Sequence, residues 1–169
     1  MYVFLALAAP AMLTLVDATG PSSAKQGILI VYDIFGFFPQ TLQGADLLAY
    51  TDKDRPFQVF MPDFFEGNPA DISWYPPDNK EKEQKLGAFF KTAAAPPKTL
   101  PRIPKIIEEL GKAKGVEKWA ILGFCWGGKV TASRDDARNR LQYSSSARLS
   151  ICRLWRARRS RPQQPATLQ

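Results

Sequence analysis

The sequence predicts an α/β fold built on a parallel, doubly wound sheet. Three short apolar runs, rich in β-branched and aromatic residues, have the composition of strands that are buried on both faces. Between them lie segments in which apolar residues recur at the i, i+3, i+4, i+7 spacing of a helix face. Strands that alternate with helices favour parallel pairing through right-handed crossovers, with functional sites at the carboxyl ends of the strands.

The first two strands are expected at residues 27–32 and 57–61. The first run, GILIVY, leads into a loop that reaches Pro39, after which a helix should place Leu42, Ala45 and Ala49 on one face. The second run, FQVFM, ends at a Pro-Asp pair. Residues 68–79 are rich in Pro and Asp and predict a loop, in which Trp74 and Tyr75 cover apolar surface.

Two helices and a third strand follow. The first helix should present one apolar face and end in the proline-rich residues 94–101, and the second should end at Gly111 or Gly115. The third strand is expected at residues 119–122, with a further helix opening over residues 129–133. The two predicted faces consist of Leu86, Phe89, Phe90 and Ala93, and of Ile103, Ile106, Ile107 and Leu110.

The two ends of the chain differ from this central part, residues 20–133. Residues 1–19 are mostly apolar, but the run is too short for a transmembrane helix. It lacks the basic start of a signal peptide and contains Pro10, so a buried strand or an altered gene start is favoured over a signal peptide. The sequence thus favours a cytoplasmic protein without a membrane partner.

The net charge of +7 belongs to the last 36 residues. Residues 1–133 carry 14 basic and 14 acidic side chains, whereas residues 134–169 carry nine arginines, no lysine and two acidic residues. Such a segment predicts a disordered tail, and the clean change from Lys to Arg suggests a change of coding frame.

The composition excludes several kinds of site. There is no histidine, so a complete Ser-His-Asp or Cys-His triad and histidine-based metal sites are excluded within these residues. The two cysteines, Cys125 and Cys152, are too few for a zinc site made of cysteine alone. We therefore predict no metal and no cofactor.

The chemically most informative segment runs from Gly123 to Gly127, with the sequence GFCWG. It has the pattern of a nucleophile elbow with Cys125 in place of serine, between a strand and a helix. Glycines two residues to either side leave room for a strained turn, and the N-terminus of the helix stabilises an anionic sulfur. The backbone N–H groups of Trp126 and Ile34 are the expected donors to an oxyanion.

Two other interpretations of this segment are open. Cys125 could be an ordinary small buried residue. The spacing from Gly123 to Lys129 also matches a phosphate-binding loop, but Val130 stands where that loop needs Ser or Thr.

Three motifs together resemble the dienelactone hydrolase family, and within it the fungal members, over about residues 20–130. They are YDIFG at 32–36, FMPDFFEG at 60–67 and LGFCWGGK at 122–129. The resemblance implies an α/β-hydrolase fold and hydrolysis of a small ester or enol-lactone by a Cys-His-Asp triad.

The resemblance also implies site residues. Cys125 matches the nucleophile of the family, Ile34 and Trp126 match its backbone oxyanion donors, and Asp33 matches an acidic residue, commonly Glu, that contacts the resting thiol. No residue matches the arginine that holds a substrate carboxylate in family members.

The departures from the family lie at both ends. The first strands of the family are expected to be missing, and so are the histidine and acid that follow the elbow helix, as in a chain truncated after the elbow. We therefore predict a family member with impaired or no turnover. An alternative is a non-catalytic fragment whose Arg-rich tail binds nucleic acid or an acidic partner, but a frame change explains the same arginines. The oligomeric state does not follow from the sequence.

Overall fold

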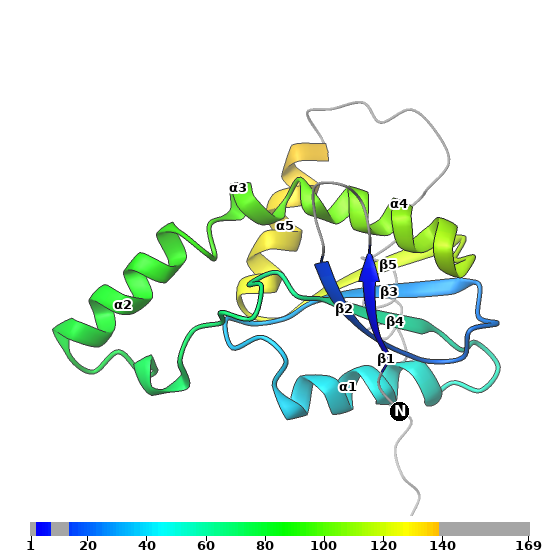
Figure 1. Cartoon of the computed structure of the whole chain (residues 1–169), viewed down its shortest axis with the longest axis horizontal. Coiled ribbons are helices and arrows are strands. Elements are labelled where there is room, and N and C mark those ends of the chain that lie inside the picture. The colour runs from blue at the N-terminus through cyan, green and yellow to red at the C-terminus, as the bar shows by residue number, and fades with distance from the viewer. Residues whose placement is uncertain (1–2, 8–13, 139–169) are drawn as a thin grey trace, which may run out of the picture.

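The computed structural model describes residues 3–7 and 14–138, which form a mixed sheet flanked by helices (Figure 1). The strands of these residues are ordered β1-β2-β4-β3-β5 across one sheet. They are β1 Val3–Leu7, β2 Thr14–Thr19, β3 Gln26–Val31, β4 Gln58–Pro62 and β5 Lys118–Gly123. The helices are α1 Pro39–Tyr50, η1 Ile72–Trp74 (a 3-10 turn), α2 Lys80–Lys91, α3 Pro96–Thr99, α4 Arg102–Lys114 and α5 Trp126–Arg138.

The three predicted strands are confirmed and form the parallel part of the sheet. β3 lies between β4 and β5 and pairs with both in parallel, with Val31 in register with Gly123. Five of the six residues of β3 and all five of β4 are buried, as their continuous apolar runs require. The parallel pairing places the ends of β3 and β5 side by side at one edge of the sheet.

The N-terminal strands depart from the sequence prediction. β1 pairs with β2, and β2 pairs with β4, both antiparallel, so the sheet is mixed rather than parallel throughout. The expectation that the first strands are missing was therefore wrong. β2 places Val16 opposite Pro62, and Val16 is buried in the core. An antiparallel strand needs no crossover helix, so a short N-terminal strand can form the hydrogen bonds along the free edge of β4.

Helices cover both faces of the sheet, as a doubly wound arrangement requires. α1 lies on one face, and α4 and α5 lie on the other (Figure 1). α1 buries Ala45 and Ala49, as expected. α4 buries Ile103, Ile106 and Leu110 and ends at Gly115, whose φ of +66° is the left-handed conformation that favours glycine at a helix end.

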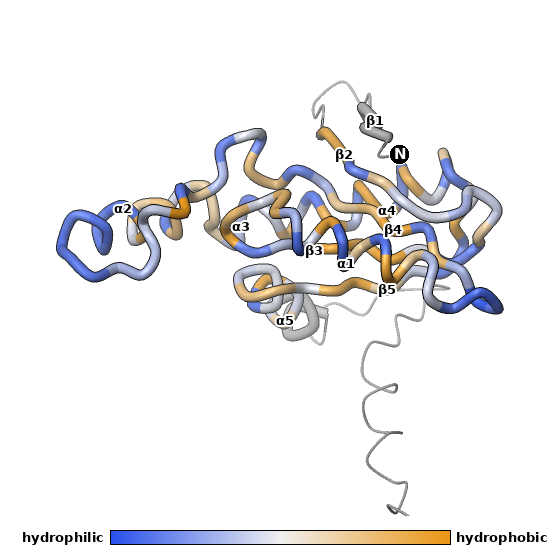
Figure 2. The backbone as a smooth tube through the Cα atoms, turned by 90° about the horizontal axis from the view of Figure 1, so that it is seen from below, coloured by the Kyte–Doolittle hydropathy of each residue, from blue (hydrophilic) through white to orange (hydrophobic). Residues whose placement is uncertain are grey.

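α2 projects beyond the carboxyl ends of the parallel strands, and its outer end is strongly hydrophilic (Figure 2). The helix begins after Asn79, whose side chain accepts a hydrogen bond of 2.9 Å from the N–H of Lys82. It buries Leu86 and Phe89, but Phe90 is 44% exposed, which corrects the predicted buried face. Because α2 projects from the rest of the molecule, it buries a narrower apolar stripe than a helix that lies flat on the sheet.

Two boundaries also differ from the prediction. The proline-rich stretch does end α2, yet it holds the single turn α3. α5 begins at Trp126 and continues to Arg138, past the boundary at 133. The remainder of the predicted tail, residues 139–169, lies outside the described residues. Among the described helices, none has the length and apolar character needed to cross a bilayer.

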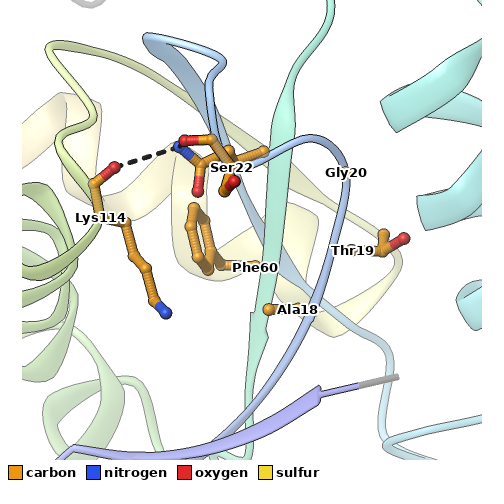
Figure 3. Close-up of a pocket in the computed structure, with 7 residues that line it drawn as sticks. Ala18, Thr19, Gly20, Ser22, Phe60 and Lys114 are labelled. Atoms are coloured by element: carbon orange, nitrogen blue, oxygen red, sulfur yellow. Dashed lines mark hydrogen bonds between the residues drawn. The ribbon is translucent and has the colours of Figure 1, made fainter. Parts of the chain in front are cut away.

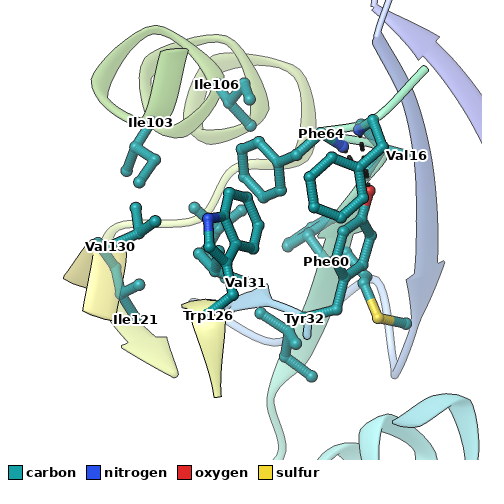
Figure 4. Close-up of a cluster of buried hydrophobic side chains, with 14 of the residues drawn as sticks. Val16, Val31, Tyr32, Phe60, Phe64, Ile103, Ile106, Ile121, Trp126 and Val130 are labelled. Atoms are coloured by element: carbon teal, nitrogen blue, oxygen red, sulfur yellow. Dashed lines mark hydrogen bonds between the residues drawn. The ribbon is translucent and has the colours of Figure 1, made fainter. Parts of the chain in front are cut away.

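A buried tyrosine joins the end of β3 to the loop that follows β4. The hydroxyl of Tyr32 donates to Asp63 Oδ1 at 2.9 Å and accepts from the N–H groups of Phe64, at 2.6 Å, and Phe65, at 3.2 Å. Burial, followed by the charge of Asp63, raises the pKa of Tyr32, so the hydroxyl keeps its proton and donates. Tyr32 and Phe64 lie together in the apolar core with Trp126 (Figure 4).

Replacing Tyr32 with phenylalanine should therefore be costly. Tyr32→Phe leaves the buried carboxylate of Asp63 and two N–H groups without this partner, and we expect the free energy of unfolding to fall by about 2–3 kcal/mol. Urea unfolding measures the loss. Tyr50→Phe, at an exposed position of α1, is the matched control and should be nearly neutral.

Asp17 is a buried carboxyl group on β2. Its Oδ1 has no hydrogen-bond partner among the described residues. Burial raises the pKa of Asp17; the N–H of Ala18 lowers it in part, and the charge of Asp46 raises it further. Since the folded state then binds the proton more tightly than the unfolded state, stability is lost as pH rises from about 4 through the raised pKa.

Asp17→Asn should remove this loss. We expect the variant to be more stable than the wild type at about pH 7 and its advantage to shrink as the pH falls through the raised pKa and to be smallest below about pH 4, where the wild-type carboxyl becomes protonated in both states. Thermal unfolding at a series of pH values measures the difference. Asp54→Asn, at an exposed carboxylate, is the control; an equal pH dependence for this variant would contradict the assignment.

Candidate active site

Cys125 lies in the sharp turn between β5 and α5. Its φ is +50°, a left-handed conformation that costs a residue with a side chain roughly 1 kcal/mol or more. The turn is held from both sides, since Gly127 N–H donates to the Phe124 carbonyl at 2.8 Å and Lys129 N–H donates to the Cys125 carbonyl at 3.2 Å. The residue is exposed, so the thiol is accessible to a ligand rather than buried as a core residue.

The two glycines of the turn are required by backbone packing. A Cβ atom on Gly127 would overlap the carbonyl oxygen of Val31 and lie 2.7 Å from that of Tyr32. A Cβ atom on Gly123 would overlap the backbone of Gly127. The start of α5 is therefore pressed directly against the end of β3, and this close approach fixes where Cys125 can lie.

The same edge of the sheet carries Asp33 and Ile34. β3 and β5 end in register at Val31 and Gly123, and Phe124 N–H continues the ladder to the Val31 carbonyl at 3.0 Å. The loop with Asp33 and Ile34 and the turn with Cys125 therefore start beside each other. This is the geometry that brings together residues about 90 positions apart in the sequence.

Asp33 is half-buried, and its carboxylate has a defined role in its own loop. Its Oδ1 accepts a hydrogen bond from Phe35 N–H at 2.8 Å, which closes the turn after β3. Among the described residues, no hydrogen bond joins Asp33 to the thiol of Cys125. The expected contact of Asp33 with the resting thiol therefore stays a prediction.

The two expected oxyanion donors lie in these two loops. Trp126 is the first residue of α5, where an N–H has no partner within the helix. Ile34 directly follows Asp33, and its carbonyl accepts a hydrogen bond of 2.9 Å from Ala70 N–H, which anchors the loop. Among the described residues, we find no protein acceptor for the N–H of either Ile34 or Trp126.

The side chain of Trp126 anchors the elbow to the apolar core. It is buried in the core (Figure 4). Its Nε1–H donates to the Ala94 carbonyl at 2.8 Å, and its ring centroid lies 4.7 Å from that of Phe65. Sequence reasoning did not assign Tyr32, Asp63 or Ala94 to the site. Tyr32 and Asp63 lie in two of the three family motifs. The signal that could have paired them is that a buried tyrosine hydroxyl needs a hydrogen-bond partner.

A pocket of about 150 Å³ lies elsewhere, at the start of β4 (Figure 3). Phe60 and Ala18 give it an apolar wall, and Lys114 borders it. The buried Gln58 braces this end by donating to the carbonyls of Ala24, at 2.7 Å, and Lys114, at 3.2 Å. Since β3, β4 and β5 are parallel, this pocket is at the opposite end of the strands from Cys125. The described residues contain no group of three metal-ligating side chains.

The comparisons with known proteins agree with this geometry. The model of the dienelactone hydrolase family matches residues 15–142. This chain belongs to the dienelactone hydrolase family. The match includes β2 to β5 and the elbow, so the three motifs and the antiparallel strand β2 are parts of one family domain.

Relatives in several organisms are similar over the same length. An uncharacterized AIM2 family protein of Schizosaccharomyces pombe is 35% identical over 112 residues, which are 66% of this chain and 43% of the relative. A carboxymethylenebutenolidase homolog of Xenopus tropicalis is 32% identical over 111 residues, which are 65% of this chain and 41% of the relative. The chain thus spans less than half the length of these relatives.

Solved structures show the fold. The dienelactone hydrolase of Anabaena variabilis has a TM-score of 0.59 at 12% identity, over 83% of this chain and 59% of that one. The thioesterase domain from the curacin biosynthetic pathway has a TM-score of 0.51 at 15% identity, over 82% of this chain and 43% of that one. The predicted α/β-hydrolase fold is confirmed.

The packing of the elbow can be tested with two glycines. Gly127→Ala forces a Cβ into the Val31 carbonyl, and we expect a loss of about 3 kcal/mol in the free energy of unfolding. Gly87→Ala, in α2 with no neighbour within 4 Å of the added Cβ, should instead stabilise by up to about 1 kcal/mol. Denaturant unfolding measures both; equal effects would show that the close approach at Gly127 does not exist.

Proposed function

We propose that this chain is a cysteine-dependent hydrolase of ester or enol-lactone bonds, with Cys125 as nucleophile. The family and the fold support a hydrolase. The observation that carries the finer assignment is the left-handed backbone of an exposed Cys125 at the junction of a parallel strand and a helix. Such strain persists only where the surrounding packing enforces it, and it is concentrated at functional sites.

The proposed chemistry begins with attack of the Cys125 thiolate on the substrate carbonyl carbon. A carbon–sulfur bond forms, and the carbonyl electrons move onto oxygen, which accepts hydrogen bonds from Ile34 and Trp126 N–H. Collapse of this intermediate breaks the bond to the leaving oxygen and gives a thioester. Water then hydrolyses the thioester and releases the acid and the thiol. In the resting state of this proposal, the Cys125 thiol donates a hydrogen bond to the second carboxylate oxygen of Asp33.

The 169 residues contain no histidine, so no imidazole of this chain can deliver a proton to the leaving group. A phenolate leaves as an anion without that help, whereas an alkoxide does not. Water attack on the thioester also lacks a general base. We therefore propose that activated esters acylate Cys125 once and that turnover is slow; the loss of a triad member typically costs on the order of 10⁴ in rate.

Acylation by p-nitrophenyl acetate tests this assignment. We expect release of one p-nitrophenolate per chain, with one acetyl group on Cys125 in the intact mass, followed by slow turnover. Cys125→Ala should abolish the burst, and Cys152→Ala, which removes the other cysteine, should retain it. A full burst in Cys125→Ala would overturn the proposal.

Added imidazole provides a second readout of the same proposal. If the missing base limits deacylation, imidazole should raise the steady-state rate of the wild type above its own background, and the Cys125→Ala variant should show the background alone. An equal increase in both proteins would show that Cys125 carries no acyl intermediate.

The nucleic-acid alternative is not favoured by the family match. The residues that would bind nucleic acid are the Arg-rich stretch 134–169, and of these the structure does not describe 139–169. No contact among the described residues supports nucleic-acid binding.

A further inference from the structure

Aromatic side chains gather beside the proposed oxyanion donor Ile34. Phe35 lies 6.3 Å from Tyr75 in an edge-to-face arrangement and 6.2 Å from Phe38, measured between ring centroids. We call Phe35, Phe38 and Tyr75 the aromatic rim. Two of its members come from the loop after β3, and the third comes from the residues after η1, about 40 positions later.

The rim is held in place by the hydrogen bonds of the two loops. Ala70 N–H donates to the Ile34 carbonyl at 2.9 Å, and this bond ties the segment before η1 to the loop after β3. Phe35 N–H donates to Asp33 Oδ1 at 2.8 Å, so the first ring of the rim follows directly on the residues of the site. The rim therefore lies at the carboxyl edge of the sheet, where Cys125 also lies.

The rim leaves apolar surface open to a ligand. Tyr75 is 61% exposed although its ring packs against Phe35, and Phe35 is half-buried. No hydrogen bond of the Tyr75 hydroxyl is found within the described residues. A large side chain that is ordered by one ring contact and otherwise exposed is typical of a binding surface.

The charges around the rim do not favour an anionic ligand. Asp33 lies two residues before Phe35, and Asp71 lies four residues before Tyr75. The Ser73 N–H, and to a smaller extent the charge of Lys85, holds the pKa of Asp71 below its usual range. The guanidinium of Arg102 donates to the carbonyls of Phe64, at 3.0 Å, and Asp63, at 3.3 Å, so it is committed to the loop after β4. Glu66 pairs with it at 3.4 Å.

We propose that the aromatic rim binds an aryl or other flat apolar group of an uncharged ester, and that Phe35 and Tyr75 determine this specificity. The inference rests on the proposed attack by Cys125 and assigns the substrate class of the same site. A flat ring would stack on Tyr75 and meet the edge of Phe35, with its ester carbonyl directed toward Ile34.

Acylation rates measure this preference without requiring turnover. The probes are p-nitrophenyl acetate, p-nitrophenyl phenylacetate and the anionic mono-p-nitrophenyl succinate, which share one leaving group. We expect the phenylacetyl ester to acylate Cys125 fastest. Tyr75→Ala should slow it about fivefold, the rate equivalent of one aromatic contact, and Tyr75→Phe, which keeps the ring, should retain the wild-type rate.

The control for exposure is Tyr50→Ala, since Tyr50 is 58% exposed and lies at the opposite end of α1 from Phe38. It should leave all three rates unchanged. Alkylation of Cys125 by iodoacetamide, which has no ring, should be equal in every variant and so separates thiol reactivity from binding. If Tyr75→Ala slows all three esters alike, the rim holds the nitrophenyl group, which is still an aryl group of the ester.

Two outcomes would overturn the inference while the proposed function stands. One is acylation that is independent of Tyr75 for every ester. The other is faster acylation by the succinyl ester than by the acetyl ester, above all if Lys129→Gln abolishes that advantage. By contrast, failure of all three esters to acylate a thiol that iodoacetamide still labels would refute the proposed function itself.

Discussion

The hydroxyl of Tyr32 connects the parts of the molecule on which the site depends. It joins the end of β3 to the loop after β4 through one donated and two accepted hydrogen bonds. That loop places Phe65 against Trp126, and Trp126 is the first residue of the elbow helix. One buried polar group thus couples three loops that are distant in the sequence. Without it the buried N–H of Phe64 would lose its acceptor, and Asp63 would lose one of its donors.

The elbow adds a second constraint of a different kind. Gly123 and Gly127 let the backbone of α5 meet the end of β3, and the left-handed Cys125 lies between them. Dense packing on both sides means that the turn cannot relax without separating the helix from the sheet. The strain at Cys125 is therefore held by the fold. The packing therefore holds an exposed thiol in a defined position at the surface, as the proposed nucleophilic role requires.

Placement and proton transfer are separate requirements, and this chain meets them unequally. The two parallel strands and the elbow bring the thiol of Cys125 and the two proposed oxyanion donors to one edge of the sheet, but the 169 residues contain no imidazole. The aromatic rim belongs to the same edge and depends on the same loop, through the bond from Ala70 to Ile34. The groups proposed for binding and attack therefore all lie between the end of β3 and the first residue of the elbow helix, and none of them is the proton carrier that the proposed turnover needs.

The sequence by itself determined the local elements and the chemical identity of the elbow. Patterns within a dozen residues predict the runs of β3, β4 and β5, the buried faces of α1 and α4, and a glycine at the end of α4, which the sequence left open between Gly111 and Gly115. Only the tertiary structure decided the antiparallel pairing of β1 and β2, the exposure of Phe90, the Tyr32–Asp63 bond and the meeting of Phe35 with Tyr75. Local patterns report which side of an element is apolar, whereas pairing direction and contacts across the chain depend on which surfaces are left to be covered once the elements pack.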